Sequence, residues 1–341
     1  MAKSKKLMAI VFSDLHLNLW SKFNEDLQRT KVGFKVLHHI AEICCKKQVP
    51  ALFCGDLFHK PEALDQDVAL IMKEHLDEFY YKYPRFKCYA IEGNHDLKHK
   101  NVLNPNDPND RSTLTKGWIS FFENDRGNHS TFTVLSPKTP AAMLGTGTDC
   151  MVHGVPYLDH NIGLTQYVKT LHLMEGYKHI LLLHTDYPGA QDTDGRPVDS
   201  VENLNMNVLN RFDLVLCGHI HKPQRLGKKV YMIGAPYQQR RTDKNCDMGY
   251  WKLYSDLSMK FVPLKGYPKF IDVASQDEVK DDGNYYTVIP QKASIEEVVK
   301  HKITKQLSKK KLAKRYMKTK GIKDKNKESL LIKVLEKSED L

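Results

Sequence analysis

The chain has 341 residues, of which 41% are hydrophobic and 27% are charged, and its formal net charge is +11. This composition is typical of a globular protein and excludes an intrinsically disordered chain. The longest wholly apolar runs are far shorter than the roughly 20 residues that a membrane-spanning helix needs, which excludes an integral helical membrane protein.

The start of the chain imitates a signal peptide, because lysines precede an apolar run over Leu7–Phe12. Asp14 interrupts the pattern without a small-residue cleavage site, so the run is predicted to be a first strand. The seven cysteines include no Cys-x-x-Cys pair, which argues against a disulfide framework and a thiolate zinc site. We expect the protein to act in reducing cytoplasm.

Five short apolar runs, each followed at once by a polar cluster, recur along the chain. Such runs before turn-forming residues are typical of fully buried strands. Two segments between the first three runs, residues 26–47 and 63–79, carry apolar side chains at helical spacing. The runs and the polar residues behind them are Leu7–Phe12 with Asp14 and His16, 51–54 with Asp56, 88–91 with Asn94 and His95, 180–183 with His184, and 214–217 with His219 and His221.

The middle of the chain is predicted to add strands. Residues 127–159 are rich in Thr, Gly and Pro and are expected to form hairpins, and residues 230–233 and 250–254 are expected to extend an adjoining sheet. The predicted fold class is therefore α/β, a layered arrangement of mixed β-sheets flanked by helices.

A domain boundary is predicted between residues 262 and 271, where Pro and Gly punctuate the chain. Beyond it we expect strands over 270–273 and 285–289 and a helix that begins with a capping box at Ser294 and Glu297. These elements make a small C-terminal α/β capping module, followed by a helical tail.

The last 51 residues hold 16 Lys or Arg against 7 Asp or Glu, so +9 of the net charge lies there. A solvated charge run is the commoner explanation of a Lys-rich stretch, but such asymmetry also suits an anionic partner. We expect three parts: a main domain over residues 1–264, the capping module over 265–318 and a C-terminal helical segment over 319–341.

The polar clusters are predicted to converge on one crevice, because open α/β sheets bind ligands at the carboxyl ends of their strands. An Asp or His after a strand most often just forms a turn, but five clusters at one topological position make that a poor explanation for the set. Oxygen and imidazole donors suit Mn, Fe or Mg, and seven suffice for two ions that polarise a phosphoryl oxygen and deprotonate a water. The predicted metal ligands are Asp14, His16, Asp56, Asn94, His184, His219 and His221, with Asp56 as the bridge.

These motifs resemble those of the calcineurin-like metallophosphoesterases over residues 7–236. Two further stretches and His59 resemble the SbcD family of DNA nucleases, which includes the recombination endonuclease subunits of large bacteriophages. The stretches are Gly218-His219-Ile220-His221-Lys222-Pro223-Gln224 and Ile233-Gly234-Ala235-Pro236.

The resemblance implies two divalent metal ions, Mn²⁺ ahead of Mg²⁺. It gives one ion to Asp14, His16, Asp56 and His221, and the other to Asp56, Asn94, His184 and His219. It also implies that His95 is the catalytic residue beside the scissile phosphate and that His59 supports the phosphate or His95.

Four other residues are predicted to assist. Arg240 and Arg241 could grip DNA phosphates, although a plain solvated pair is an equal alternative. Asp96 and Asp186 could hold the second nitrogen of a ligating histidine, or merely cap turns.

The resemblance also implies a function: a metal-dependent nuclease, exonuclease on double-stranded and endonuclease on single-stranded DNA, in recombination and repair. Its implied partner is an SbcC-type coiled-coil ATPase that binds the C-terminal helices, with the nuclease as a homodimer within a heterotetramer and no membrane association. The implied location is the cytoplasm, or the host cytoplasm for a phage protein.

Two alternatives remain open. The same ligands serve relatives that are phosphodiesterases or phosphatases on non-DNA phosphoesters, and neither function requires a basic C-terminal segment. A scaffold without catalysis would be favoured by lost ligands, but all seven predicted ligands are present.

Overall fold

The computed structural model describes most of the chain before residue 290. The predicted capping-box helix and the helical tail lie outside these described residues, which are 5–60, 66–97, 117, 119, 132–137, 139–145, 148–198, 201 and 204–289. The chain divides into two compact units, one made of Met1–Asp272 and Val279–Thr287 and the other of Val273–Glu278 and Val288–Leu341. The proposed boundaries at 264 and 318 stay predictions.

The first sheet has six strands in the order β12-β11-β1-β2-β3-β4. Strands β1 to β4 run parallel, whereas β11 is antiparallel to both β1 and β12. The first three apolar runs of the sequence are therefore strands, as predicted. The bounds are β1 Leu7–Phe12, β2 Ala51–Phe53, β3 Cys88–Ala90, β4 Phe132–Val134, β11 Gly249–Tyr254 and β12 Met259–Pro263.

The second sheet also has six strands, in the order β5-β6-β7-β8-β10-β9. Strands β6, β7, β8 and β10 run parallel, and β5 and β9 are antiparallel edges. The fourth and fifth apolar runs are confirmed as β7 and β8. The bounds are β5 Ala141–Met143, β6 Cys150–Gly154, β7 Lys178–His184, β8 Leu214–Gly218, β9 Gln224–Leu226 and β10 Val230–Met232.

Two predictions about strand pairing are wrong in part. The segments 230–233 and 250–254 were expected in one adjoining sheet, but β10 lies in the second sheet and β11 in the first. Among the described residues of 127–159, the antiparallel ladder is that of β5 with β6, whereas β4 runs parallel to β3 in the other sheet.

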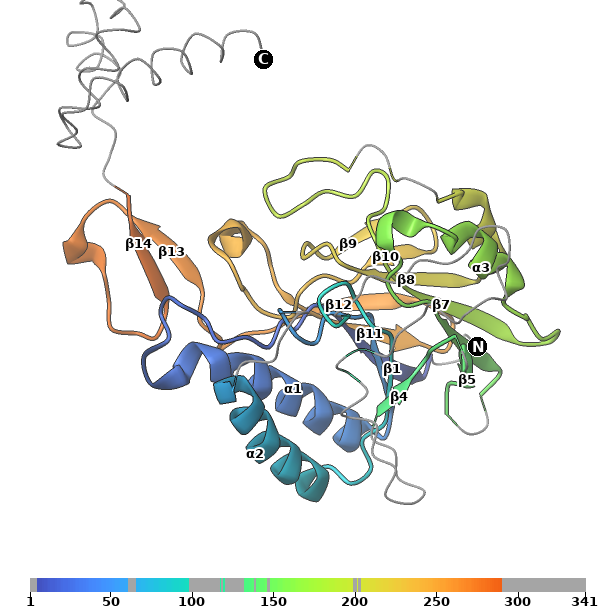
Figure 1. The fold of residues 1–341 in the computed structure, drawn as a ribbon, viewed down its shortest axis with the longest axis horizontal. Coiled ribbons are helices and arrows are strands. Elements are labelled where there is room, and N and C mark those ends of the chain that lie inside the picture. The colour runs from blue at the N-terminus through green and yellow to red at the C-terminus, as the bar shows by residue number, and fades with distance from the viewer. Residues whose placement is uncertain are drawn as a thin grey trace, which may run out of the picture. The chain divides into compact units, whose positions relative to one another are not determined.

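Helices cover the outer faces of both sheets. Figure 1 shows α1, Gln28–Lys47, and α2, Gln66–Lys82, together on the first sheet, as the helical spacing predicts. The second sheet carries the short helix α3, Leu164–Thr170. Single 3-10 turns occupy Glu25–Leu27, Asp159–Asn161, Met206–Arg211, Arg241–Asn245 and Gln276–Glu278.

Alternating side chains of the strands build three apolar layers. In β1, Ile10 and Phe12 face the helices α1 and α2, whereas Val11 packs between the two sheets. In β7, Leu182 joins the same inter-sheet layer and Leu183 faces the α3 side. Each fully buried aliphatic side chain of this kind contributes about 1.5–3 kcal/mol to folding. The four layers, helix, sheet, sheet and helix, confirm the predicted fold class.

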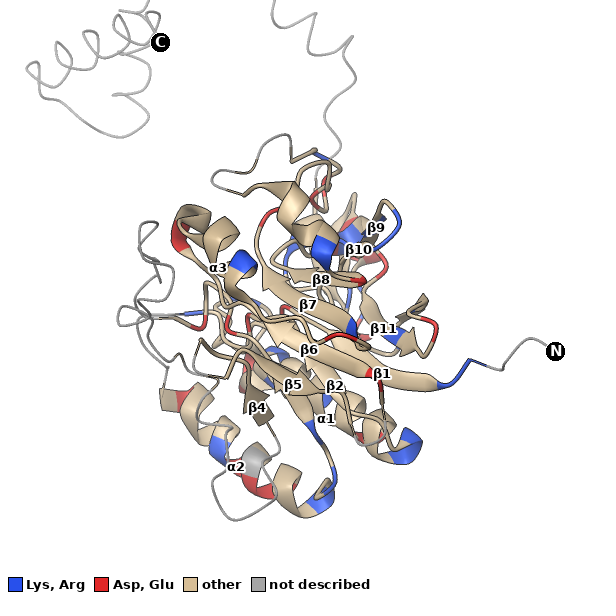
Figure 2. Cartoon of the chain, turned by 90° about the vertical axis from the view of Figure 1, so that its right-hand side faces the viewer, with Lys and Arg blue, Asp and Glu red and all other residues tan. Residues whose placement is uncertain are grey.

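The central strands of the second sheet contain few charged residues. Figure 2 shows Lys, Arg, Asp and Glu mainly on helices and loops, and β6 and β8 contain none of the four residue types. None of the helices in the described ranges combines the length and the apolar character needed to cross a membrane.

The two strands predicted after the boundary are present. They are β13, Phe270–Val273, and β14, Tyr285–Val288, and they form a two-stranded sheet.

Candidate metal centre

The five polar clusters come together at the carboxyl ends of five strands. Asp14, Asp56 and Asn94 follow β1, β2 and β3 of the first sheet. His184 ends β7 and His219 follows β8, both in the second sheet. The predicted convergence therefore occurs across two packed sheets rather than at one open sheet.

The first group of donors is Asp14, His16 and His221, whose ligand atoms all lie within 4.8 Å of one another. His16 Nε2 is 3.2 Å from His221 Nε2 and 3.9 Å from Asp14 Oδ1. All three side chains are buried. Three of the four residues assigned by resemblance to the first ion thus face one point.

The second group is Asp56, His184 and His219, again with ligand atoms within 4.8 Å of one another. Asn94 belongs with them, because its Oδ1 lies 3.0 Å from both His184 Nε2 and His219 Nδ1. Asp56 Oδ2 lies 3.2 Å from His184 Nε2 and 3.6 Å from His16 Nε2 of the first group. One carboxylate oxygen therefore faces both groups, which is the position that a bridging ligand requires.

Four of the seven predicted ligands have a left-handed backbone. Non-glycine residues rarely adopt positive φ, and such strain is concentrated at functional sites. The residues are Asp14 (φ 54°), His16 (φ 48°), Asp56 (φ 61°) and His219 (φ 92°). The turns after the strands are thus shaped to aim these side chains, a feature that residue types alone do not reveal.

Asp96 holds the loops of the second group in place. Its buried carboxylate accepts hydrogen bonds from the backbone N–H groups of Asp56 (2.8 Å) and Gly93 (2.9 Å), and also from those of Leu57 and Phe58. It was considered as a support for a ligating histidine, but the described contacts make it a backbone anchor. This anchor fixes Asp56 relative to the turn that carries Asn94.

Two glycines allow these loops to approach closely. A Cβ atom at Gly93 would collide with the carboxylate of Asp56. Gly55 has a φ of +94°, and a Cβ there would lie 2.5 Å from His184 Nδ1. The glycines of the Gly-Asp and Gly-Asn motifs are therefore needed for close packing as well as for the turn.

Polar contacts of the outer nitrogens orient two of the histidines. His184 Nδ1–H donates to the Cys54 carbonyl at 2.7 Å, which leaves Nε2 facing Asp56 and Asn94. His219 turns Nδ1 towards Asn94, and its Nε2 lies 3.5 Å from Asp186 Oδ1. Asp186 thus lies where the predicted support of a ligating histidine would be.

Asp56 and His184 form a strongly coupled pair. Burial alone would lower the pKa of His184, but the adjacent Asp56 carboxylate raises it to about 9. Burial would raise the pKa of Asp56, but His184 and then His16 hold it well below its usual range. A positive charge is therefore favoured at this point, and a metal cation satisfies the same requirement.

His95 and His59 lie together beside the first group. The His95 N–H donates to Asp56 Oδ1 at 2.8 Å, and His95 Nδ1–H donates to the His59 carbonyl at 2.6 Å. Their rings stack with centroids 5.2 Å apart, and His59 Nδ1 lies 3.3 Å from His16 Nδ1. Burial, followed by the nearby His95, lowers the pKa of His59 to about 4, so His59 is neutral at physiological pH. Their predicted catalytic roles stay predictions.

The two arginines predicted to contact DNA have different surroundings. Arg240 Nη2 lies 3.1 Å from His221 Nε2, at the edge of the first group. Arg241 instead makes a two-point ion pair with Asp272, with distances of 2.7 and 3.1 Å. Arg240 is therefore the better placed of the two for a phosphate at the centre.

Residues 237–243 also supply supports that sequence reasoning missed. Asp243 is fully buried, its Oδ2 lies 3.7 Å from His221 Nδ1, and it accepts the backbone N–H of Arg240 at 3.1 Å. The Gln239 side chain donates to the Asp14 carbonyl, and Tyr237 Oη donates to the Leu15 carbonyl at 2.8 Å. No pattern in the sequence pointed to these contacts, because they depend on how the segment packs against the loop after β1.

The donor set fits divalent metal ions. Carboxylates and imidazoles make up both groups, Asn94 adds an amide oxygen to the second, and no cysteine belongs to either among the described residues. Mixed oxygen and imidazole sets of this kind suit Mn²⁺ or Mg²⁺.

The comparison with known proteins agrees with this geometry. The calcineurin-like phosphoesterase family matches residues 8–223, which is more than half of the chain and includes all seven predicted ligands. A solved crystal structure is similar over 75% of this chain and 98% of its own, at 14% sequence identity and a TM-score of 0.43. By the family match, this chain belongs to the calcineurin-like phosphoesterases, hydrolases that cleave phosphoesters with divalent metal ions.

Proposed function

We propose that the protein is a DNA nuclease of the SbcD type, an exonuclease on double-stranded DNA and an endonuclease on single-stranded DNA. The observation that carries the phosphodiesterase chemistry is the single Asp56 oxygen that faces both donor groups. The residues of the first group would hold one ion with Asp56, and the second group would hold the other with Asn94.

Two divalent ions bound in this way would polarise a phosphoryl oxygen and lower the pKa of an attacking water. The chain's own residues would do the rest. His95 has its Nδ1 proton engaged by the His59 carbonyl, so its Nε2 is the nitrogen left to protonate the leaving oxygen. Arg240, which lies beside His221, would bind a backbone phosphate whatever the sequence of the DNA.

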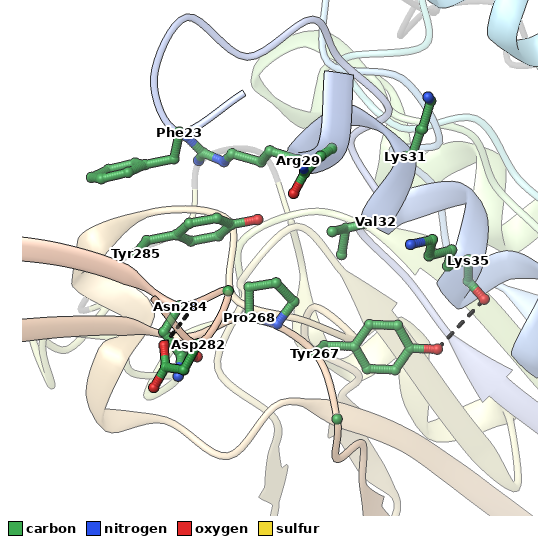
Figure 3. A pocket seen from close by; sticks show the side chains of 13 residues that line it. Phe23, Arg29, Lys31, Val32, Lys35, Tyr267, Pro268, Asp282, Asn284 and Tyr285 are labelled. Atoms are coloured by element: carbon green, nitrogen blue, oxygen red, sulfur yellow. Dashed lines mark hydrogen bonds between the residues drawn. The ribbon is translucent and has the colours of Figure 1, made fainter. Parts of the chain in front are cut away.

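A neighbouring cavity supports DNA as the substrate. It has a volume of about 540 Å³ and lies between the start of α1 and the segment 266–285. Figure 3 shows Lys31 and Lys35 on the α1 side and the rings of Phe23 and Tyr285 opposite. Cationic and aromatic side chains together are typical of single-strand binding, where each stacked base contributes about 1–3 kcal/mol.

Arg29 connects this cavity to the metal centre. Its Nη2 donates to the Gln239 carbonyl at 2.6 Å, and the Gln239 side chain in turn donates to the Asp14 carbonyl. The Arg29 guanidinium also lies 4.2 Å from the Trp20 ring, which is 5.3 Å from the His59 ring. A strand cleaved at the centre would thus find basic and aromatic surface next to it.

The proposal includes the partner that the resemblance implies. We propose that an SbcC-type ATPase binds the C-terminal helices predicted within residues 294–341 and that the nuclease acts as a homodimer within that complex. The concentration of positive charge in this segment supports a contact role.

A substrate comparison tests the proposed function. In Mn²⁺, the protein is expected to degrade linear duplex DNA and circular single-stranded DNA, but to leave a cyclic dinucleotide and a phosphopeptide intact. Asp56→Asn should reduce DNA cleavage by more than about a hundredfold, because it removes the charge shared by both donor groups. Asp194→Asn, a change on an exposed loop, is the matched control. Hydrolysis of the phosphopeptide or the cyclic dinucleotide in place of DNA would contradict the nuclease assignment and keep the phosphoesterase one.

A further inference from the structure

A second cluster of metal-binding side chains lies between the helices α1 and α2, away from the strand ends. It consists of His38 on α1 and of His75 and Glu78 on α2. Their ligand atoms all lie within 4.8 Å of one another. His75 and Glu78 are three residues apart, so they project from the same face of their helix towards α1.

Packing fixes the two rings. His75 stacks flat on Phe34, with centroids 4.7 Å apart and planes 9° apart. The His38 ring meets Phe79 edge-on at 5.5 Å. Both imidazoles are half-buried, so they are held in place but can still be reached from solvent.

The two rings present their nitrogens to one another. His38 Nε2 lies 3.1 Å from His75 Nδ1, and His75 Nδ1 is 4.0 Å from Glu78 Oε2. Burial lowers the pKa of both imidazoles, which keeps them uncharged and leaves each a lone pair. The other Glu78 oxygen, Oε1, is 3.4 Å from Lys82 Nζ, so Oε2 is the one on the histidine side.

We propose that His38, His75 and Glu78 form a metal site for a borderline divalent ion of the Zn²⁺ or Co²⁺ type, which joins α1 to α2. Two nitrogens bound to one tetrahedral ion at 2.0–2.1 Å lie about 3.3 Å apart, close to the spacing found here. The Glu78 side chain is 53% exposed, so it is free to rotate the remaining distance to the ion.

The chemistry of this site differs from that of the strand-end centre. Two imidazoles and one carboxylate are a donor set that zinc uses when it keeps a fourth position for water. The strand-end centre adds the amide oxygen of Asn94 and a carboxylate of Asp56 that faces both groups, and this mixed oxygen and imidazole set suits Mn²⁺ or Mg²⁺. The helix site would serve to link α1 to α2 within the helical layer on the first sheet.

Zinc content measured by mass spectrometry tests this site in the full-length protein. The protein is stripped with a chelator, loaded with Zn²⁺ and desalted. We expect His38→Ala and His75→Ala to hold one equivalent less zinc than the wild type. The adjacent His39→Ala is the matched control and should retain the wild-type amount, because His39 is outside the cluster. Any zinc at the strand-end centre is common to all variants and cancels in the comparison.

A binding titration with Co²⁺ provides a second measurement, on a variant whose substitution is expected to leave folding intact. His38→Ala should remove the tightest Co²⁺ site. Glu78→Gln changes an exposed side chain and should weaken Co²⁺ binding at that same site by more than about tenfold. Manganese-dependent phosphoester cleavage should stay at the wild-type level in all three cluster variants, since none touches the strand-end residues. Equal zinc content in the wild type and both histidine variants, or an unchanged Co²⁺ affinity in Glu78→Gln, would overturn the site.

Discussion

Asp56 and His184 show how single residues set the chemistry of the centre. Both are buried, and the His184 imidazolium and the Asp56 carboxylate stabilise one another at 3.2 Å. The same two side chains face a predicted ion, so the proton on His184 Nε2 and the metal compete for one place. This competition gives the centre a defined response to pH.

Metal binding is expected to release about one proton at pH 7. The pKa of His184 is raised to about 9, so below that pH the metal-free protein carries a proton that an ion must displace. Apparent affinity should therefore fall about tenfold for each unit that the pH drops below 9. Calorimetric titration of Mn²⁺ in buffers with different ionisation enthalpies measures the released proton. Heats that do not depend on the buffer would show that His184 is already neutral.

His95 should be separable from the metal ligands. Its backbone N–H contacts Asp56, its ring packs edge-on against that of His16, and its side-chain hydrogen bond goes to the His59 carbonyl. His95→Ala is thus expected to lower turnover by about 10²- to 10⁴-fold while the Mn²⁺ content stays at the wild-type level. Steady-state kinetics and metal analysis of the same preparation check both parts. Loss of metal from the variant would make His95 a ligand instead.

The sequence predicted these residues because each follows a buried strand, a position that is readable from the chain alone. It could not predict the positive φ of Asp56 or the contact between Asp243 and His221. Both depend on tertiary packing, which brings the segment 237–243 against the loop after β1.

At the level of elements, α1 has one face for the core and another for the adjacent cavity. Val32, Val36 and Ile40 are buried against the first sheet. Lys31 and Lys35, four residues apart, are exposed beside the cavity and have no ion-pair partner among the described residues. The helix therefore carries two positive charges beside the cavity that no described acidic side chain pairs with.

Replacing both lysines should weaken single-stranded DNA binding by about tenfold or more at low salt. Each lysine that neutralises a phosphate contributes roughly 0.7 to the slope of log K against log salt, so the double variant should lose about 1.4 from that slope. Fluorescence anisotropy over a salt series measures both changes. Lys46→Ala with Lys47→Ala, at the far end of the same helix, is the matched control. Equal losses in the two double variants would refute a specific role for the cavity.

Strand positions could be predicted, but their partners could not. The runs at 230–233 and 250–254 are strands, yet they belong to different sheets. A short apolar run records burial on both faces, whereas the neighbouring strand is chosen by packing between distant segments. The long helices were predictable because a 3.6-residue period persists over α1 and α2.

For the whole molecule, the seven predicted ligands all precede residue 222, whereas most of the net positive charge lies after residue 290. Hydrolysis and partner binding are therefore expected to be separable along the chain. The uneven charge along the sequence predicted this division, whereas the identity of the partner was implied only by the family resemblance.

Removal of residues 290–341 should leave the Mn²⁺ content unchanged and reduce association with an SbcC-type ATPase. The physical reason is that the described strand-end contacts do not involve this segment, which carries the basic surface proposed for the partner. Co-purification of the tagged ATPase with full-length and shortened chains measures the loss, and metal analysis is the internal control. Undiminished co-purification would place the partner surface elsewhere.

Each donor group draws on both sheets: Asp14 and His16 face His221, and Asp56 faces His184. Neither sheet alone supplies all the ligands of either donor group. A shift of one sheet relative to the other along the apolar layer that contains Val11 and Leu182 would disrupt both groups of metal ligands at once. Catalytic activity therefore reports whether the two sheets are packed together correctly.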